Sequence, residues 1–405
     1  MSDQPPDLAS PASAHRRLPA SARHRARAAT MALFFVAGMM YASWGVHVPT
    51  VRDKFALSPA LLSFALLAVA IGSIVAMTTN ARWIARVGSR TACLAGGLAM
   101  SASGALILVV PTYPLLLAVL AVLALFGFSM ATLDVAMNAE ASAVESAFGK
   151  PIMSMLHGMF SVGGMAGAAA GGALLSAGMA SAVHLGLAAL ASALVLALAC
   201  PAVLPHVPHT AAADGAPRAN RWRSPALWAL GAIALVALIA EGAMYDWATV
   251  YMRDVVLASP AFSSAAYAAF SGGMAAARFA GDAVRARFGA PQLVCASATL
   301  ACVGMIAALA LPSPFVALAG FTLMGLGLAN MMPVLFAAAA RIDGIHAAEG
   351  LAHVAGLAYF GLLFGPVAIG AVTQAANLSV GLSIVALCAA LVAIVAPQVL
   401  SRLKI

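Results

Sequence analysis

Charged residues are scarce in this sequence. Asp, Glu, Lys and Arg together make up 8% of its 405 residues, whereas hydrophobic residues make up 63%. A soluble globular domain carries roughly 25% charged residues, because water has to solvate its surface. The shortage of charge therefore excludes a soluble domain and predicts an integral membrane protein. The net charge of +8 sits mostly in loops and tails, so it indicates membrane topology rather than a nucleic-acid surface.

Cysteine pairs and the sequence motifs of enzymes are also missing. The five cysteines all lie in apolar runs and none forms a CxxC pair, so disulfides and metal sites have little support. The chain contains no GxxxxGK[ST] phosphate loop, no GxSxG motif and no HExxH motif. We therefore expect neither an enzyme nor a bound cofactor or metal.

Long apolar runs dominate the rest of the chain. A helix of about 20 apolar residues crosses a bilayer, whereas barrel strands would alternate in polarity over about ten residues. The sequence predicts an all-α membrane protein with twelve transmembrane helices, near 30–51, 59–80, 91–110, 114–136, 151–177, 181–204, 225–250, 260–281, 291–311, 314–339, 348–375 and 378–399.

The basic residues indicate how these helices are oriented. If both termini are cytoplasmic, only Arg52, Lys54 and Arg253 of the 21 lysines and arginines fall on the outside. This distribution agrees with the excess of Lys and Arg in cytoplasmic loops. We expect a disordered cytoplasmic tail over 1–28, six-helix halves over 29–204 and 225–405, and a cytoplasmic linker over 205–224.

An internal repeat relates the two halves. Arg52-Asp53 recurs 201 residues later as Arg253-Asp254, and Ser58-Pro59-Ala60 recurs in the same register as Ser259-Pro260-Ala261. Parallel repeats of this kind are typical of secondary transporters, in which the solute site lies near the middle of the membrane between the halves.

The twelve predicted helices, the repeat, the long central loop and RxG turns after the second and eighth spans resemble the major facilitator superfamily. The resemblance covers all but the N-terminal tail. The stretches LDVAMNAEASAVE, GKPIMSMLHGMFSVGG and EGAMYDWATVYMRD are similar to a bacterial MosC-like or YbjJ-like branch, which is related to sugar–proton symporters. The resemblance implies a transporter of the bacterial inner membrane that alternates between inward-open and outward-open states.

The superfamily signature GxxxDRxGRR, which follows the second helix, is altered in this chain. Ala81 and Ala85 replace its first Gly and its Asp, and the second copy also has Ala at the Asp position. We therefore expect the usual charge relay to be changed in both halves. The gate residues predicted from the sequence are Arg86, Arg90, Asp282 and Arg287 on the inner side and Asp246, as a cap or gate contact, at the outer interface.

Polar residues inside the apolar runs are the candidates for a solute and proton pathway. A charged group at the centre of a membrane helix costs about 2.5–3.5 kcal/mol on insertion scales, so such groups usually face a cavity or a partner. The resemblance implies that helices 1, 4, 7 and 10 line the central cavity, where most of these residues fall. The candidates are Glu241, His157, Asp134, Asn138, Tyr245, Trp44, Asn330 and His353.

Glu241 is the first candidate for a proton-coupling acid, followed by His157 and Asp134. Tyr245 lies one turn beyond Glu241 and shares its helix face. His157 and His353 occupy corresponding helices of the two halves, where a histidine can relay protons or bind solute. The alternative for each of these residues is a structural hydrogen bond or ion pair between helices.

The sequence thus predicts a secondary active transporter that moves a sugar-like or other small polar solute in symport with protons. The Met- and Phe-rich composition leaves proton-coupled drug or metabolite efflux open, and a transporter-like membrane receptor is the alternative from another class. The partners we expect are a small-molecule solute, protons and the lipid bilayer, without nucleic acid, and we expect a monomer.

Overall fold

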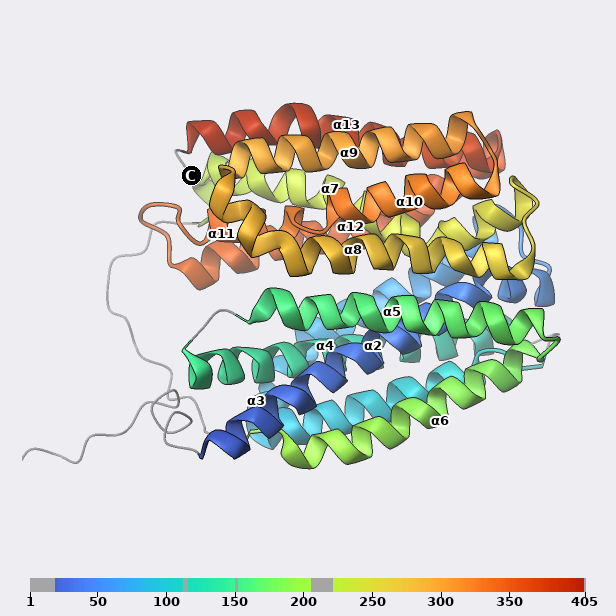
Figure 1. The fold of residues 1–405 in the computed structure, drawn as a ribbon, viewed down its shortest axis with the longest axis horizontal. Helices are drawn as coiled ribbons and strands as arrows, with labels where there is room; N and C mark the ends of the chain where they lie inside the picture. The colour runs from blue at the N-terminus through green and yellow to red at the C-terminus, as the bar shows by residue number, and fades with distance from the viewer. Residues whose placement is uncertain (1–18, 112–115, 150–151, 205–220, 404–405) are drawn as a thin grey trace, which may run out of the picture.

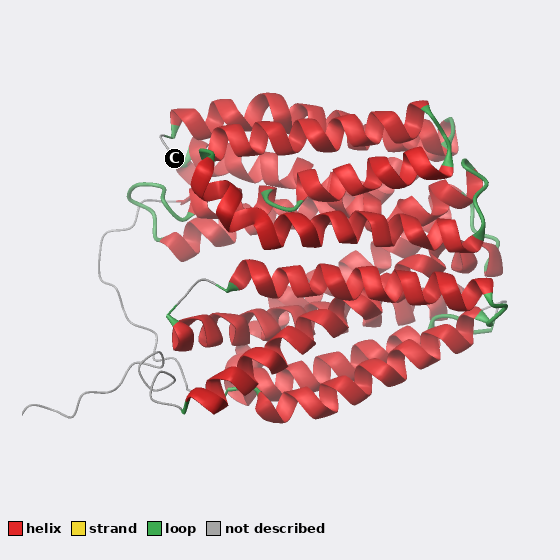
Figure 2. Cartoon of the chain, in the orientation of Figure 1, coloured by secondary structure: helices red, strands yellow, loops and turns green. Residues whose placement is uncertain are grey.

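The computed structural model describes residues 19–111, 116–149, 152–204 and 221–403 (Figure 1). Within these ranges every regular element is a helix, and no strand occurs (Figure 2). The predicted all-α fold class is therefore confirmed.

Five long helices precede the central linker. They are α2 (Ala20–Lys54), α3 (Pro59–Leu106), α4 (Leu116–Phe148), α5 (Met153–Ser176) and α6 (Ser181–Ala199), and the short η1 (Cys200–Ala202) follows them. Gly88 interrupts α3 with a φ of 83°, a conformation that glycine adopts at little cost. The two arms of α3 are the predicted second and third spans.

The second group of helices follows η2 (Arg221–Arg223). It contains α7 (Pro225–Asp254), α8 (Pro260–Arg287), α9 (Ala290–Ala310), α10 (Pro314–Leu328), α11 (Met331–Ala339), α12 (Ala347–Ala375) and α13 (Leu378–Arg402). The helices α3, α7 and α10 begin with Ser-Pro, and the serine hydroxyl accepts a backbone N–H of the first turn. A serine cap followed by proline starts a helix sharply, since proline at the first position loses no internal hydrogen bond.

Ten stretches of described helix are long and apolar enough to cross a membrane, with α10 and α11 counted together as Pro314–Ala339. The second arm of α3 and helix α8 are the other two predicted spans. The chain thus has the twelve-helix architecture that the sequence predicts.

Helices α2 and α4 extend farthest past their predicted limits. Helix α2 begins at Ala20, so residues 20–28 are helical rather than disordered, whereas 1–18 lie outside the described residues. This stretch is rich in Ala and Arg, which favour helix formation although they are not a long apolar run. Helix α4 continues to Phe148, so the more polar residues that follow its apolar run are helical as well. Of the predicted linker, 205–220 lie outside the described residues.

The helices form a single bundle in which α2 to α6 lie in the lower part of Figure 1 and α7 to α13 in the upper part. The start of α2 and the end of α13 lie at the same end of the bundle, called here the terminal end. The two groups of helices meet mainly where α5 packs on α8, α3 on α12, and α2 on α7. The boundary between the two groups of helices is therefore formed mainly by these three helix pairs.

Close packing of α5 on α2 depends on glycine. A Cβ atom at Gly163 would lie 2.0 Å from the carbonyl oxygen of Phe35, so the two backbones would have to move apart. We expect Gly163→Ala to cost about 1–3 kcal/mol of stability, the usual range for overpacking. The measurement is thermal unfolding in detergent. The matched control is Gly186→Ala, because nothing lies within 4 Å of a Cβ there; equal unfolding temperatures for the two variants would contradict the prediction.

Candidate functional site

A cavity of about 200 Å³ lies between the two groups of helices. Side chains from α2, α3, α4, α5, α7 and α12 line it, and most of them are apolar. A concave, mostly apolar space with a few polar groups is typical of a small-molecule site. The polar side chains on its wall are Tyr41, Ser73, Asp134, Glu241, Tyr245, Asp246 and Tyr359.

Glu241 belongs to a polar network that reaches beyond the cavity. Its Oε1 lies 3.7 Å from Nη2 of Arg278 on α8, and the hydroxyl of Tyr245 donates a long hydrogen bond of 3.5 Å to the same oxygen. Arg278 Nη1 donates to Ser161 Oγ at 2.8 Å and to the His157 carbonyl at 3.3 Å, both on α5. The network therefore connects α7 and α8 with α5 in the other group of helices.

Two more carboxyl groups face the same cavity. Asp134 on α4 accepts a hydrogen bond of 3.1 Å from the Asn138 amide, as expected for residues one turn apart. Asp246 also lines the cavity, which corrects its predicted position at the outer interface. Helix α7 continues to Asp254, about two turns farther, so the helix has not yet left the bundle at Asp246.

The other predicted pathway residues lie outside the cavity wall. Trp44 is buried and packs against Phe126, with ring centroids 6.3 Å apart. The ring of His157 packs edge-on against Phe34 at 5.1 Å. His353 packs against Trp222 and Trp228. Asn330 lies at the N-cap position of α11, without a side-chain hydrogen bond to the first turn.

Among the described side chains, the predicted inner-gate residues form no common network of contacts. Arg86 and Arg287 are exposed, and the Arg287 guanidinium lies 5.9 Å from the ring centroid of Phe288. Arg90 donates a hydrogen bond of 2.7 Å to the Val203 carbonyl. The side chain of Asp282 lies outside the described part of the structure.

The altered signature has no Asp near the Gly88 kink. Glu140 of α4 supplies a carboxylate there instead. Its side chain is buried and accepts hydrogen bonds from Ser89 Oγ at 2.9 Å and from the Leu204 backbone N–H at 2.7 Å. It thereby joins the end of α4 to the second arm of α3 and to the segment after η1. The predicted fourth span ends near 136, before Glu140, whereas in the structure helix α4 continues to Phe148 and this carboxylate is buried.

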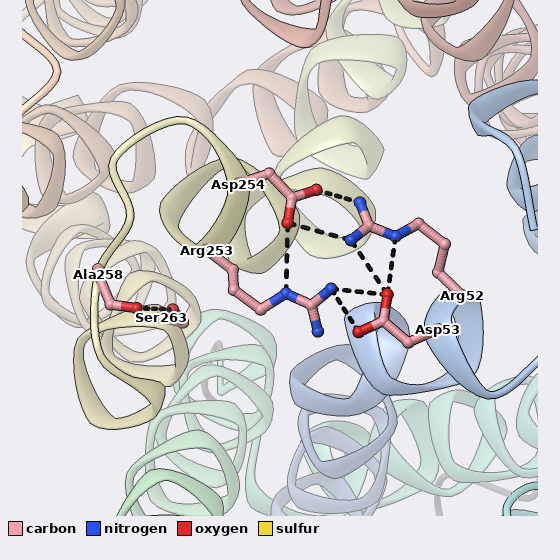
Figure 3. A network of polar contacts seen from close by, with 6 residues as sticks. All are labelled: Arg52, Asp53, Arg253, Asp254, Ala258 and Ser263. Carbon is pink, nitrogen blue, oxygen red and sulfur yellow. Dashed lines mark hydrogen bonds and ion pairs between the residues drawn. The ribbon is translucent and has the colours of Figure 1, made fainter. Parts of the chain in front are cut away.

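Four charged residues in the last turns of α2 and α7 join the two groups of helices (Figure 3). They lie at the end of the bundle opposite the terminal end (Figure 1). Arg52 of α2 pairs with Asp254 of α7 through both nitrogens of its fork, and Arg253 Nη2 lies 2.8 Å from Asp53. The two pairs are equivalent under the internal repeat. We call Arg52, Asp53, Arg253 and Asp254 the charge quartet.

A hydrogen bond between Thr249 and Gly45 joins the same two helices as the charge quartet. Thr249 Oγ1 on α7 donates to the Gly45 carbonyl on α2 at 3.0 Å. All three contacts cross between α2 and α7, so they hold the two groups of helices together at this end of the bundle.

Arg278 was missed as a site residue because it was counted among the basic residues of the cytoplasmic side, although the predicted span 260–281 contains it. The internal repeat nevertheless indicates where Arg278 lies in the bundle. The residue 201 positions earlier is Met77, which lines the cavity. A position equivalent to a cavity residue is expected to face the interior of the bundle.

Comparisons with known proteins agree with this architecture. The sequence model described as Major Facilitator Superfamily matches residues 30–281. An uncharacterized MFS-type transporter of Yersinia pestis is 33% identical over 361 residues, covering 88% of this chain and 91% of its own length. The membrane protein MosC of Rhizobium meliloti is 30% identical over 346 residues, covering 85% of this chain and 83% of its own length.

Solved structures share the fold at low sequence identity. The nucleoside transporter NupG, solved as a point mutant, has a TM-score of 0.67 at 13% identity and covers 90% of this chain and 98% of its own. The transporter FucP, solved in the outward conformation, has a TM-score of 0.59 at 16% identity and covers 92% of this chain and 98% of its own. Family, relatives and fold agree: the chain belongs to the major facilitator superfamily and is a multi-pass membrane transporter, not an enzyme.

Proposed function

We propose that this protein is a proton-coupled symporter for a small polar solute in the bacterial inner membrane. Its two six-helix halves, 29–204 and 225–405, alternate in access to the cavity, with both termini cytoplasmic and the chain acting as a monomer. The observation that carries the proposal is Glu241, a carboxyl group that faces the cavity and contacts Arg278 at the boundary between the groups of helices. A carboxyl group held inside a membrane protein is a group that can take up and release a proton.

The polar wall of the cavity supports a hydrogen-bonding solute. Tyr41, Ser73 and Tyr359 bring hydroxyl groups to it, and Asp134 and Asp246 bring acceptors. A solute with several hydroxyl groups can satisfy donors and acceptors of this kind, which a purely apolar molecule would leave unpaired. The cavity volume of about 200 Å³ limits the solute to a small molecule.

The apolar share of the wall favours a second candidate, the efflux of a lipophilic drug or metabolite in exchange for protons. Phe160, Met77 and Met130 line the cavity, and methionine adapts to ligands of different shape. A receptor that uses the transporter fold would bind the solute without moving it.

Uptake into proteoliposomes separates these functions. Purified protein is tested with labelled sugars, polyols, carboxylates, amino acids and lipophilic cations, under a proton gradient imposed in either direction. We expect a sugar-like or other small polar solute to accumulate when the proton gradient points in the same direction as solute entry. Accumulation against the direction of proton flow would establish antiport, and saturable binding without flux in either direction would establish a receptor.

A further inference from the structure

The described wall of the central cavity carries acids but no bases. Asp134 of α4 and Glu241 and Asp246 of α7 bring three carboxyl groups to it. No Lys, Arg or His occurs among the described residues that line it. Arg278, which is not part of the wall, faces Glu241 at 3.7 Å and can balance one negative charge. Two of the three carboxyl groups are therefore left without a cation from the described part of the chain.

Asp246 is the acid of the cavity that has no polar partner. Glu241 faces Arg278, and Asp134 accepts a hydrogen bond from the Asn138 amide. The side chain of Asp246 is partly buried on the wall, and it makes no hydrogen bond or ion pair with any described residue. An ionised carboxyl group inside a membrane protein is costly without a positive partner. A ligand with a positive charge would supply that partner.

Two aromatic rings share the cavity wall with Asp246. Tyr245 directly precedes Asp246 in α7, and Tyr41 comes from α2 in the other group of helices. Their ring centroids lie 5.7 Å apart, and the ring planes make an angle of 74°. The face of an aromatic ring attracts a cation that lies within about 6 Å of its centroid. The rings therefore favour the same kind of ligand as the unpaired carboxyl group.

The cavity also offers hydroxyl groups that no described residue uses. The phenol groups of Tyr41 and Tyr359, from α2 and α12, line the cavity and make no hydrogen bond within the described part of the chain. A phenol can both donate and accept a hydrogen bond, so it can pair with a hydroxyl group of a solute. The wall thus combines an unpaired acid with neutral hydrogen-bonding groups.

We propose that the transported solute carries a protonated amine and that Asp246 is the residue that binds it. The inference rests on the proposed function, in which this cavity holds the solute, and it narrows the small polar solute to a hydroxylated amine. The ammonium group donates hydrogen bonds to the Asp246 carboxylate beside the ring of Tyr245. Glu241 stays available for the coupled proton, because Arg278 and not the solute balances its charge.

A neutral solute requires a different state of Asp246. If Asp246 holds a proton of its own, it needs no positive partner, and a sugar or polyol binds as well as the corresponding amine. The two cases differ in one measurable quantity, which is the preference for an amine over a hydroxyl group on the same carbon skeleton.

Matched solute pairs measure this preference in the full chain. The pairs are glucosamine and glucose, glucamine and sorbitol, and ethanolamine and ethylene glycol. Uptake into proteoliposomes is corrected with protein-free liposomes, since an uncharged amine crosses a bilayer unaided. Thermal stabilisation of the protein in detergent reports binding that occurs without transport. In at least one pair we expect the amine to be preferred by about 10- to 100-fold, the range that a hydrogen bond to a charged group contributes.

Asp246→Asn gives the readout that is specific to the residue. Asparagine keeps the size of the side chain but has no charge, so the amine-to-hydroxyl ratio should fall to about one. Asp134→Asn is the matched control inside the cavity, because Asp134 already has the Asn138 amide as a partner, and it should keep most of the preference. Asp343→Asn, at an exposed position, should keep all of it.

Two results would overturn the proposal. Equal uptake and equal stabilisation by the two members of every pair, or neither effect with any of them, would remove the amine as the substrate class. A preference that persists unchanged in Asp246→Asn would remove Asp246 as its binding residue. If Asp246→Asn does not fold, the wild-type ratios still decide the substrate class.

The proposed function fails in a different way. Uptake of an amine that does not respond to the proton gradient would remove proton-coupled symport and leave the amine site. Uphill uptake of a sugar or polyol, with no preference for its amine, would remove only the amine site.

Discussion

Glu241→Gln is expected to abolish uphill solute accumulation while solute exchange across the membrane continues. Glutamine keeps the size of the side chain and its ability to hydrogen-bond to Arg278 and Tyr245, but it has no proton to release. Exchange of solute for solute needs only alternation of the loaded protein, so it does not require proton release. Net accumulation requires the proton to leave on the far side.

The size of the effect follows from the proton gradient. One pH unit corresponds to 1.36 kcal/mol per proton, so a gradient of about two units and one proton per solute supports accumulation of about 100-fold. In Glu241→Gln the solute should only equilibrate, with a ratio of about one between the two sides. The measurement is the steady-state ratio of labelled solute in proteoliposomes.

Asp343→Asn is the matched control for this prediction. It also converts a carboxylate to an amide, but at an exposed position in the turn after α11. We expect it to accumulate solute as the wild type does. Accumulation that persists in Glu241→Gln would move the coupling role to Asp134, which faces the same cavity, and then to His157.

Reversal of one charge in the quartet is expected to open the end opposite the termini. Arg52→Asp removes the pair with Asp254 and places a third carboxylate beside Asp53 and Asp254. Exposed ion pairs contribute roughly 0–1 kcal/mol each, and repulsion between like charges adds to the loss. We expect a change of about 1–2 kcal/mol, which is about 5- to 30-fold in the ratio of open to closed protein.

The measurement is the distance between spin labels on the two groups of helices. Ala177 at the end of α5 and Leu311 at the end of α9 are exposed near the quartet end. The partly exposed Cys295 and Cys302 are first replaced by Ala, since the other cysteines are buried. In Arg52→Asp the longer distance should gain population relative to the parent chain.

Two controls separate the ion pairs from other effects of the substitution. The charge-swapped chain Arg52→Asp/Asp254→Arg restores an attractive pair across the two helices and should recover most of the closed population. The effect of Arg52→Asp should also weaken at about 1 M salt, where the screening length is only about 3 Å. A distance distribution that is unchanged by Arg52→Asp at low salt would show that the quartet does not hold this end shut.

Hydrophobicity and repetition were sufficient to predict the fold. Long apolar runs have to become helices in a membrane because every backbone polar group needs a partner, so spans such as 225–250 were predicted within a few residues of α7. The Gly88 turn and the Ser-Pro starts are local signals that a sequence displays directly. Helix ends such as that of α4 were harder to predict, since helix formation continues into polar sequence.

The site was only partly predictable for a physical reason. Glu241, Asp134 and Tyr245 stand out because polar groups in apolar runs are costly, and all three line the cavity. Arg278 lies near the end of the predicted span 260–281 and Glu140 lies just beyond the predicted span 114–136, so hydropathy alone does not indicate what either residue contacts. Their burial depends on contacts with residues more than 30 positions away, which the repeat indicates for Arg278 and nothing in the sequence indicates for Glu140.

The most direct test of proton-coupled symport is the reverse of uptake, in which a solute gradient alone drives protons. Proteoliposomes that contain a pH-sensitive dye, with no imposed proton gradient, receive an external pulse of the solute identified by uptake. The account predicts acidification of the interior that follows solute entry, is absent in Glu241→Gln and is retained in Asp343→Asn. Solute entry without any pH change in the wild type would contradict proton-coupled symport and would indicate a uniporter.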